Sequence, residues 1–270
     1  MKKMIAMLLA LVMALSLAAC GEKANDGNTD NDAAKTELVL GTSADYAPFE
    51  FMYPDDSGEM VYGGIDVSVA KYIADEMGLT LQVENMGFDY LLTSLDKGDF
   101  DIVLAAMEAT PDRLENADFS DPYYTDVPPA ILVKADKADQ YKTLADLNGK
   151  SVGAQTATTK LDMVNEMEGV TPVALQSVLD LVNELVYDKV DAILVDGGVA
   201  KEYAASNPDL VIADASAELG EATPYCVAVA KGLLPAINAA IAKMNEANML
   251  ETFIADAGKL ADVAVNVTAD

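Results

Sequence analysis

The chain of 270 residues contains no histidine, no tryptophan and only one arginine, Arg113. Without histidine, it lacks the base of Ser-His-Asp and Cys-His nucleophile systems and the imidazole ligands of metal sites. Cysteine is almost as scarce, with Cys20 and Cys226 alone. These scarcities disfavour most catalysis, and we expect no catalytic residue, no cofactor and no metal site.

Positive charge is also scarce. Lys and Arg together number 17 against 45 Asp and Glu, which gives a formal net charge of -28 at pH 7. This acidity opposes nucleic-acid binding, because such binding depends on neutralising phosphates with Lys and Arg. Hydrophobic residues make up 51% of the chain, a content that disfavours disorder over most of its length. The length suits one or two domains, each with a buried core.

The N-terminal segment predicts an export signal. After a short basic start, residues 4–19 form an apolar run that is shorter than the roughly 20 residues of a membrane span. Leu17-Ala18-Ala19-Cys20 resembles the lipobox of bacterial lipoproteins, which implies cleavage before Cys20 and a lipid on its sulfur. We expect a signal peptide over 1–19, a flexible tether over 20–36, and a protein lipid-anchored to the outer face of a bacterial cell membrane. The alternative is an N-terminal anchor helix.

From residue 37 onward, short apolar runs alternate with amphipathic segments, and this β-α-β rhythm predicts an α/β fold with parallel sheets. The run Asp101 to Met107 is continuous, as in a strand buried on both faces. Thr110-Pro111 is typical of the N-cap and first residue of a helix. The expected strands are 37–42, 79–83, 101–107, 131–134, 151–155, 170–175, 190–195, 210–213 and 225–230, and the expected helices are 66–77, 88–97, 143–147, 161–167, 178–187, 199–205, 235–246 and 250–257.

An internal echo suggests two similar lobes. Residues 95–105 resemble residues 185–195, since each is a helix end, a turn, an aspartate and a buried strand. The alternative is a chance recurrence of a common helix-strand unit. Prolines near 126–129 and at 224 limit backbone freedom where the chain is expected to cross between lobes. The expected division is lobe 1 over 37–125, lobe 2 over 126–223, and a return to lobe 1 over 224–270.

Polar side chains follow the predicted strands, at the edge where ligands of open α/β sheets bind. Together they suit a small zwitterion: an arginine for its carboxylate, hydroxyls and helix N-terminal amides beside it, and an acid for its ammonium. The residues expected to bind ligand are Ser43, Asp45, Tyr46, Phe88, Ala106, Glu108, Arg113, Thr156, Thr158, Thr159 and Asp196.

Each of these residues also has a purely structural interpretation. Arg113 can be a surface residue paired with Glu115 or Asp118, although its uniqueness and its position after a strand favour a ligand contact. Asp196 can cap the helix that follows it, and Thr158 and Thr159 can do the same for theirs. For Phe49 and Cys226 a place in the core is the better interpretation.

Six segments in this order resemble family 3 extracellular solute-binding proteins, the amino-acid receptors of ABC importers. The segments are 41–51 (GTSADYAPFEF), 64–70 (GIDVSVA), 106–113 (AMEATPDR), 118–124 (DFSDPYY), 144–153 (LADLNGKSVG) and 190–196 (VDAILVD). The resemblance runs from about residue 37 to residue 260. It implies the type II periplasmic-binding-protein fold, with two lobes, two crossover strands and a ligand cleft between them.

By position, Arg113 resembles the arginine that holds the ligand's α-carboxylate, and Thr159 its partner hydroxyl in lobe 2. Asp196 resembles the acid that holds the α-ammonium, and Tyr46 and Phe88 resemble the aromatic residues of the side-chain pocket.

Several positions depart from the family, and two of them bear on the ligand. Glu108 replaces a small hydroxyl residue, and its carboxylate either meets a cationic part of the ligand or turns outward. Ser43 stands where many receptors for basic amino acids have Asp, which weakens a lysine or arginine assignment.

The resemblance implies a monomeric binding lipoprotein that closes on a free amino acid, with a polar or basic one favoured, and delivers it to ABC permease subunits. A first alternative is an enzyme resembling cyclohexadienyl dehydratase, with Glu108 as its acid–base group. A second is a sensor lipoprotein that only binds.

Overall fold

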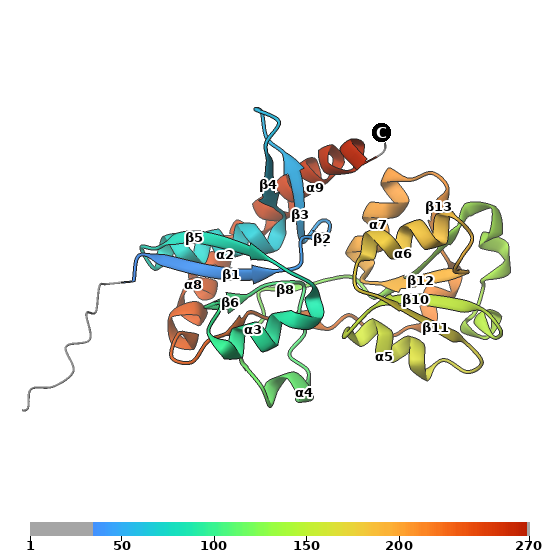
Figure 1. Cartoon of the computed structure of the whole chain (residues 1–270), viewed down its shortest axis with the longest axis horizontal. Coiled ribbons are helices and arrows are strands. Elements are labelled where there is room, and N and C mark those ends of the chain that lie inside the picture. Colours follow the sequence, from blue (N-terminus) through green and yellow to red (C-terminus); the bar gives the residue numbers. More distant parts are fainter. Residues whose placement is uncertain (1–34, 269–270) are drawn as a thin grey trace, which may run out of the picture. The chain divides into compact units, whose positions relative to one another are not determined.

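The computed structural model describes residues 35–268, with side chains described as far as residue 264 (Figure 1). The predicted signal peptide, Cys20 and nearly all of the predicted tether lie outside the described residues. Among the helices within the described range, none is long and apolar enough to cross a membrane.

Two five-stranded sheets organise the described chain, and we call the bodies built on them lobe 1 and lobe 2. The order in lobe 1 is β5-β1-β6-β15-β7, and in lobe 2 it is β11-β10-β12-β9-β13. The strands of lobe 1 are β1 (Glu37–Thr42), β5 (Thr80–Asn85), β6 (Ile102–Val103), β7 (Asp118–Phe119) and β15 (Ala228–Val229). The strands of lobe 2 are β9 (Ala130–Lys134), β10 (Ser151–Gln155), β11 (Thr171–Leu175), β12 (Ala192–Val195) and β13 (Leu210–Ile212).

Each sheet is mixed, which corrects the expectation of parallel sheets. In lobe 1, β1 runs parallel to β5 and β6, but β15 pairs antiparallel with both β6 and β7. In lobe 2, β10 runs parallel to β11 and β12, but β9 pairs antiparallel with both β12 and β13. The antiparallel strands β9 and β15 are the first sheet strands after the chain has crossed from one lobe to the other. Their direction depends on the crossing, which a local pattern of apolar residues does not record.

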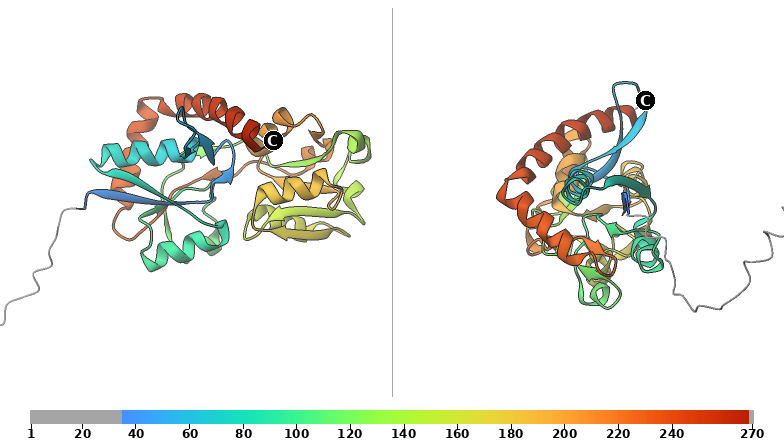
Figure 2. Two further views of the ribbon diagram at one scale, coloured as in Figure 1. Left: turned by 45° about the horizontal axis from the view of Figure 1, so that its top comes forward. Right: turned by 90° about the vertical axis from the view of Figure 1, so that its left-hand side faces the viewer.

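Helices cover both faces of each sheet. In lobe 1 the residues of β6 and its extension alternate, so that Ile102 and Leu104 face the core under α2 and α8 while Val103 and Ala105 face α3. Figure 2 shows these helices on opposite faces of the sheet. In lobe 2, α5 covers one face, and α6 and α7 cover the other. The helices are α2 (Ile65–Glu76), α3 (Leu91–Lys97), α4 (Pro111–Leu114), α5 (Thr159–Glu166), α6 (Val178–Val186), α7 (Gly197–Ser206), α8 (Leu234–Glu246) and α9 (Met249–Thr268).

Short 3-10 turns complete the chain. They are η1 (Phe88–Tyr90), η2 (Ala135–Gln140), η3 (Leu144–Leu147) and η4 (Asp214–Glu218). The helix expected over 88–97 is therefore split between η1 and α3, the segment expected to be helical over 143–147 is η3, and the last helix extends well beyond the expected 250–257.

One small sheet was not predicted. Strands β2 (Asp45–Tyr46), β3 (Glu50–Pro54) and β4 (Met60–Gly63) form an antiparallel sheet against α9. A local signal for its hairpin exists in the sequence Asp55-Asp56-Ser57-Gly58. The Asp55 carboxylate accepts hydrogen bonds from the backbone N–H groups of Ser57 and Glu59 at 2.8 and 3.0 Å, and Gly58 adopts a positive φ of 85°.

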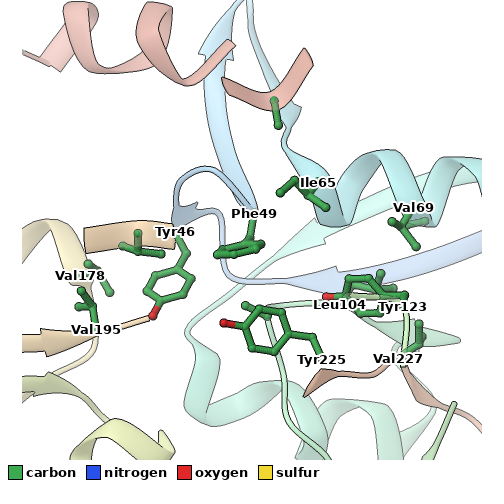
Figure 3. Close-up of a cluster of buried hydrophobic side chains, with 14 of the residues drawn as sticks. Tyr46, Phe49, Ile65, Val69, Leu104, Tyr123, Val178, Val195, Tyr225 and Val227 are labelled. Carbon is green, nitrogen blue, oxygen red and sulfur yellow. The ribbon is translucent and has the colours of Figure 1, made fainter. Parts of the chain in front are cut away.

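Two further strands cross between the lobes. β8 (Tyr124–Thr125) follows β7 where the chain leaves lobe 1, and β14 (Pro224–Tyr225) precedes β15 where the chain returns to lobe 1. The two strands pair antiparallel. The rings of Tyr124 and Tyr225 stack at 5.9 Å, and each lies edge-on to Phe49, at 5.5 and 5.3 Å. Phe49 is fully buried, as predicted. Figure 3 shows Phe49 close to Tyr46 and Tyr225, so an aromatic cluster lies beside the crossing strands.

Two carboxyl groups are buried beneath this cluster. Glu50 in β3 and Asp66 in α2 are almost wholly enclosed. Burial raises the pKa of Asp66 to about 6, although its carboxylate accepts hydrogen bonds from Ala106 N–H and Tyr123 O–H at 2.7 Å each. Burial also raises the pKa of Glu50 well above its usual value, and the neighbouring Asp66 charge raises it further. Both effects favour the neutral form of the Glu50 carboxyl.

We predict that Glu50→Gln reduces the loss of stability as the pH rises. A carboxyl whose pKa is raised by folding stabilises the protein below its unfolded pKa, and that contribution is lost as the pH rises towards the folded pKa. A neutral amide does not titrate, so this loss is absent from the variant. Between pH 5 and pH 8 the unfolding free energy of the variant should therefore rise relative to that of wild type by about 1 kcal/mol or more, since one pKa unit corresponds to about 1.4 kcal/mol. Urea unfolding at both pH values measures this. The exposed control Glu59→Gln should follow the wild type, and equal pH slopes for all three proteins would contradict the prediction.

Candidate functional site

Arg113 is held at the junction of the lobes by a short helix that begins where the sequence indicated. Thr110 is the N-cap of α4, with Pro111 in the first turn, and its hydroxyl accepts the Arg113 backbone N–H at 3.4 Å. The Arg113 side chain is only 11% exposed, so it does not extend into solvent. Its guanidinium carbon lies 5.3 Å from the centroid of the Phe88 ring, a cation–π distance.

The loop that carries Glu108 is shaped by a buried aspartate. The expected strand 101–107 pairs only over Ile102–Val103, because the backbone turns at Ala106, whose φ is 46°. The Asp66 carboxylate accepts the Ala106 N–H at 2.7 Å, and this bond holds the residue in a conformation that few non-glycine residues adopt. The turn places Glu108 opposite Tyr225, with which it forms an isolated antiparallel bridge. Ala106 thus helps to position Glu108 through its backbone.

The Glu108 carboxylate lies between two cations from opposite lobes. Its Oε2 faces Arg113 Nη1 at 3.3 Å, and its Oε1 accepts hydrogen bonds from the Thr159 hydroxyl at 2.9 Å and from Lys160 Nζ at 2.6 Å. Arg113 Nη1 also donates to the Glu108 carbonyl at 2.9 Å, and Nη2 donates to the Ala157 carbonyl at 3.1 Å. Glu108 is 5% exposed and Lys160 is 6% exposed, so these bonds form away from bulk water.

Asp196 completes the group. Lys160 Nζ forms an ion pair with Asp196 Oδ1, and the Tyr46 hydroxyl donates to Asp196 Oδ2 at 2.7 Å. The same hydroxyl accepts the Asp196 backbone N–H at 3.0 Å. Asp196 does occupy the N-cap position of α7, but its side chain makes no capping hydrogen bond. The interpretation of Asp196 as a helix cap is therefore wrong for its carboxylate, which serves the junction of the lobes instead.

We call Glu108, Arg113, Lys160 and Asp196 the charge cluster. Burial raises the pKa of Glu108, but Lys160 and Arg113 lower it by more, so the pKa lies below its usual value. Burial lowers the pKa of Lys160, but Asp196 and Glu108 raise it by more, so the pKa lies above its usual value. Glu108 and Lys160 are therefore both charged at neutral pH. With two acids and two bases, the cluster carries no formal net charge, which buried ions require.

Two of the other sequence-predicted residues lie beside the charge cluster, at a second contact between the lobes. The Asp45 carboxylate accepts the backbone N–H of Val178 at 3.0 Å, at the N-terminus of α6, and faces the Ser43 hydroxyl at 3.4 Å. A carboxylate at this end of a helix is stabilised by the helix dipole and by unpaired N–H groups. Burial raises the pKa of Asp45 nonetheless, because it outweighs these hydrogen bonds.

Two of the predicted threonines have structural roles. Thr158 is the N-cap of α5, where its hydroxyl accepts the Leu161 N–H at 3.2 Å and donates to the Gln155 carbonyl at 2.6 Å. Thr156 donates its backbone N–H to the Leu175 carbonyl. Neither is among the described residues that contact Glu108, whereas Thr159 is.

Sequence analysis missed Lys160, the residue that links both carboxylates of the cluster. One signal was available, because Lys160 lies in the first turn of α5, where a cation is disfavoured by the helix dipole. A lysine at such a position needs partners from elsewhere in the fold, and these come from loops far away in the sequence.

A surface pocket of about 880 Å³ adjoins the cluster. Phe88, Met107, Arg113 and Ala157 are among its lining residues, which continue over α3 and α4. The lining does not include Glu108, Lys160 or Asp196, which pack against one another instead. The pocket therefore opens onto the outer side of Arg113 and not onto the space around Asp196.

This architecture is that of a solute-binding protein with the type II periplasmic-binding-protein fold. Residues 38–255 match the model for bacterial extracellular solute-binding proteins, family 3, and the chain belongs to that family.

Individual relatives agree with this assignment. The arginine-binding extracellular protein ArtP of Bacillus subtilis is 37% identical over 224 residues, which cover 81% of this chain and 83% of that protein. A probable histidine-binding protein of Campylobacter jejuni is 32% identical over 78% of this chain and 80% of its own length. Among solved structures, the amino acid ABC transporter substrate-binding protein AbpA of Streptococcus pneumoniae, bound to L-arginine, has a TM-score of 0.79 at 34% identity, covering 84% of this chain and 96% of that one.

We predict that Tyr46→Phe destabilises the protein by about 1–3 kcal/mol, because it leaves a buried carboxylate oxygen and a backbone N–H of Asp196 without their partner. Urea unfolding at pH 7 measures the change. Tyr187→Phe is the matched control, since Tyr187 is 71% exposed and should tolerate the loss of its hydroxyl. Equal unfolding free energies for the two variants would show that the Tyr46 hydroxyl contributes nothing.

Proposed function

We propose that this protein is the lipid-anchored substrate-binding component of an ABC importer, and that it captures a free polar or basic amino acid between its lobes. The observation that carries this proposal is the meeting of Arg113, Thr159 and Asp196, which suits the carboxylate and ammonium of an amino acid. Arg113 belongs to lobe 1 and the other two belong to lobe 2. A ligand that contacts all three can therefore hold the lobes together.

Each residue has a distinct role in this proposal. The planar guanidinium of Arg113 presents paired donors to the ligand's carboxylate, and the Thr159 hydroxyl adds a third. Asp196 accepts the ammonium, while Tyr46 orients the Asp196 carboxylate through the bond between them. Phe88, which already packs against the guanidinium, provides an aromatic surface for the ligand side chain.

A basic side chain is the first to test. Several relatives are named for arginine or histidine, and the AbpA structure contains L-arginine. Asp126 interacts electrostatically with Asp196 of the cluster, and two acids close together suit a guanidinium or ammonium group. Ser43 stands where many receptors for basic amino acids have an acid. Amino acids with polar neutral side chains therefore remain candidate ligands.

The remaining parts of the proposal concern its setting. Lipidation of Cys20 would hold the protein at the outer face of the membrane, where the lobes closed on ligand are recognised by the permease subunits. The alternative of a dehydratase-like enzyme receives little support from Glu108. A general acid at neutral pH needs a raised pKa, whereas the cations beside Glu108 lower its pKa despite burial.

A thermal-shift screen tests the proposal directly. Ligand that binds only the folded state raises the melting temperature, by an amount that grows with concentration above Kd. We expect arginine, lysine, histidine or a polar neutral amino acid at millimolar concentration to raise the melting temperature, while prephenate-like acids and dipeptides do not. The absence of a shift with every amino acid would contradict the proposed function, and a shift with prephenate alone would favour the enzyme.

We further predict that Arg113→Lys weakens ligand binding by about 10- to 100-fold, because a lysine cannot reproduce a buried bidentate bond of about 1.5–3 kcal/mol. Isothermal titration with the amino acid found in the screen measures the change. The substitution preserves charge, and the melting temperature without ligand serves as the control for folding. An unchanged Kd in a folded variant would remove Arg113 from the site.

A further inference from the structure

Side chains at the junction of the lobes make with one another the hydrogen bonds and ion pairs that a bound amino acid is expected to make with them. The proposed function assigns Arg113 and Thr159 to a ligand carboxylate and Asp196 to a ligand ammonium. In the structure all three are already engaged by Glu108 and Lys160.

Glu108 stands in for the ligand's carboxylate. Its two oxygens divide between the expected partners, with Oε2 at 3.3 Å from Arg113 Nη1 and Oε1 at 2.9 Å from the Thr159 hydroxyl. The chemistry is that of the proposed ligand contact, a carboxylate held by a guanidinium and a hydroxyl. Glu108 contacts Arg113 and Thr159 at the same time, as the ligand's carboxylate is expected to do.

Lys160 stands in for the ligand's ammonium. Its Nζ forms an ion pair with Asp196 Oδ1 and donates to Glu108 Oε1 at 2.6 Å. Together the Glu108 carboxylate and the Lys160 ammonium reproduce the two charged groups of a zwitterionic amino acid, joined by a hydrogen bond instead of a carbon atom. The neighbouring pocket of about 880 Å³ is lined by Arg113 but by neither Glu108 nor Lys160.

The pair also crosses between the lobes. Glu108 follows β6 of lobe 1, and Lys160 lies in α5 of lobe 2. Further contacts act across the same junction, from Tyr46 to Asp196 and from Arg113 to the Ala157 carbonyl. Contacts within the chain itself therefore link the two lobes.

We propose that Glu108 and Lys160 form an internal substitute for the ligand's charged groups, which closes the ligand-free protein and sets its affinity by competing for Arg113, Thr159 and Asp196. This rests on the proposed function, because it takes an amino acid as the competitor. An amino acid must displace the pair before it can bind, so the apparent Kd is the intrinsic Kd divided by the fraction of molecules in which the pair is open. The long, flexible lysine stem suits such a displacement.

The affinity test uses Glu108→Ser combined with Lys160→Met. The double substitution removes one acid and one base, so the cluster keeps its zero formal charge with Arg113 and Asp196 in place. We expect the double variant to bind its amino acid at least tenfold more tightly than wild type by isothermal titration. Lys201→Met is the control for lysine removal at an exposed site of α7 and should leave Kd unchanged. An equal or weaker affinity in the double variant would overturn the proposal.

The second test needs no ligand. Small-angle X-ray scattering of the ligand-free proteins should give a larger radius of gyration for the double variant than for wild type and for Lys201→Met, because the lobes lose their internal link. Identical radii would overturn the proposal even if both proteins bind amino acids. If the double variant expands but neither protein binds any amino acid, the internal pair is retained and the proposed function fails. The two failures are thus distinguishable.

Discussion

The junction of the lobes depends on one buried carboxylate, that of Glu108, placed between the guanidinium of Arg113 and the ammonium of Lys160. A carboxylate enclosed to this degree is costly unless its charge is balanced and its oxygens are hydrogen-bonded. Arg113 balances this charge within lobe 1, whereas Thr159 and Lys160 of lobe 2 bind the second oxygen, so both oxygens are satisfied only when the lobes are together. The same requirement explains Asp196, which balances the second charge of the pair.

A second set of buried polar groups holds the loop that leads to this junction. Asp66 holds the Ala106 N–H and so fixes the loop that presents Glu108, while Glu50, whose pKa burial raises well above its usual value, lies beside Asp66. The aromatic cluster of Phe49, Tyr124 and Tyr225 surrounds the crossing strands nearby. Close packing of these side chains leaves the loop that carries Glu108 with few alternative conformations.

Family membership identifies the class of this protein, whereas the contacts of Glu108 and Lys160 describe the site of this chain in particular. The family match covers most of the chain, and the relatives include a structure that contains L-arginine. In this chain the side chains of Glu108 and Lys160 contact the groups expected to hold a ligand. The departure at Glu108 was visible in the sequence, but its meaning depended on a partner 52 residues away.

The sequence alone determined the features that rest on local chemistry. The apolar run of β1, the Thr110-Pro111 helix start, the burial of Phe49 and the special standing of the single arginine can all be read from neighbouring residues. Only the tertiary structure decided the direction of β9 and β15, the turn at Ala106 and the role of Lys160. Each of these depends on groups that are distant in the chain. One segment alone does not indicate an ion pair or a strand direction, because the partner segment comes close only when the chain folds.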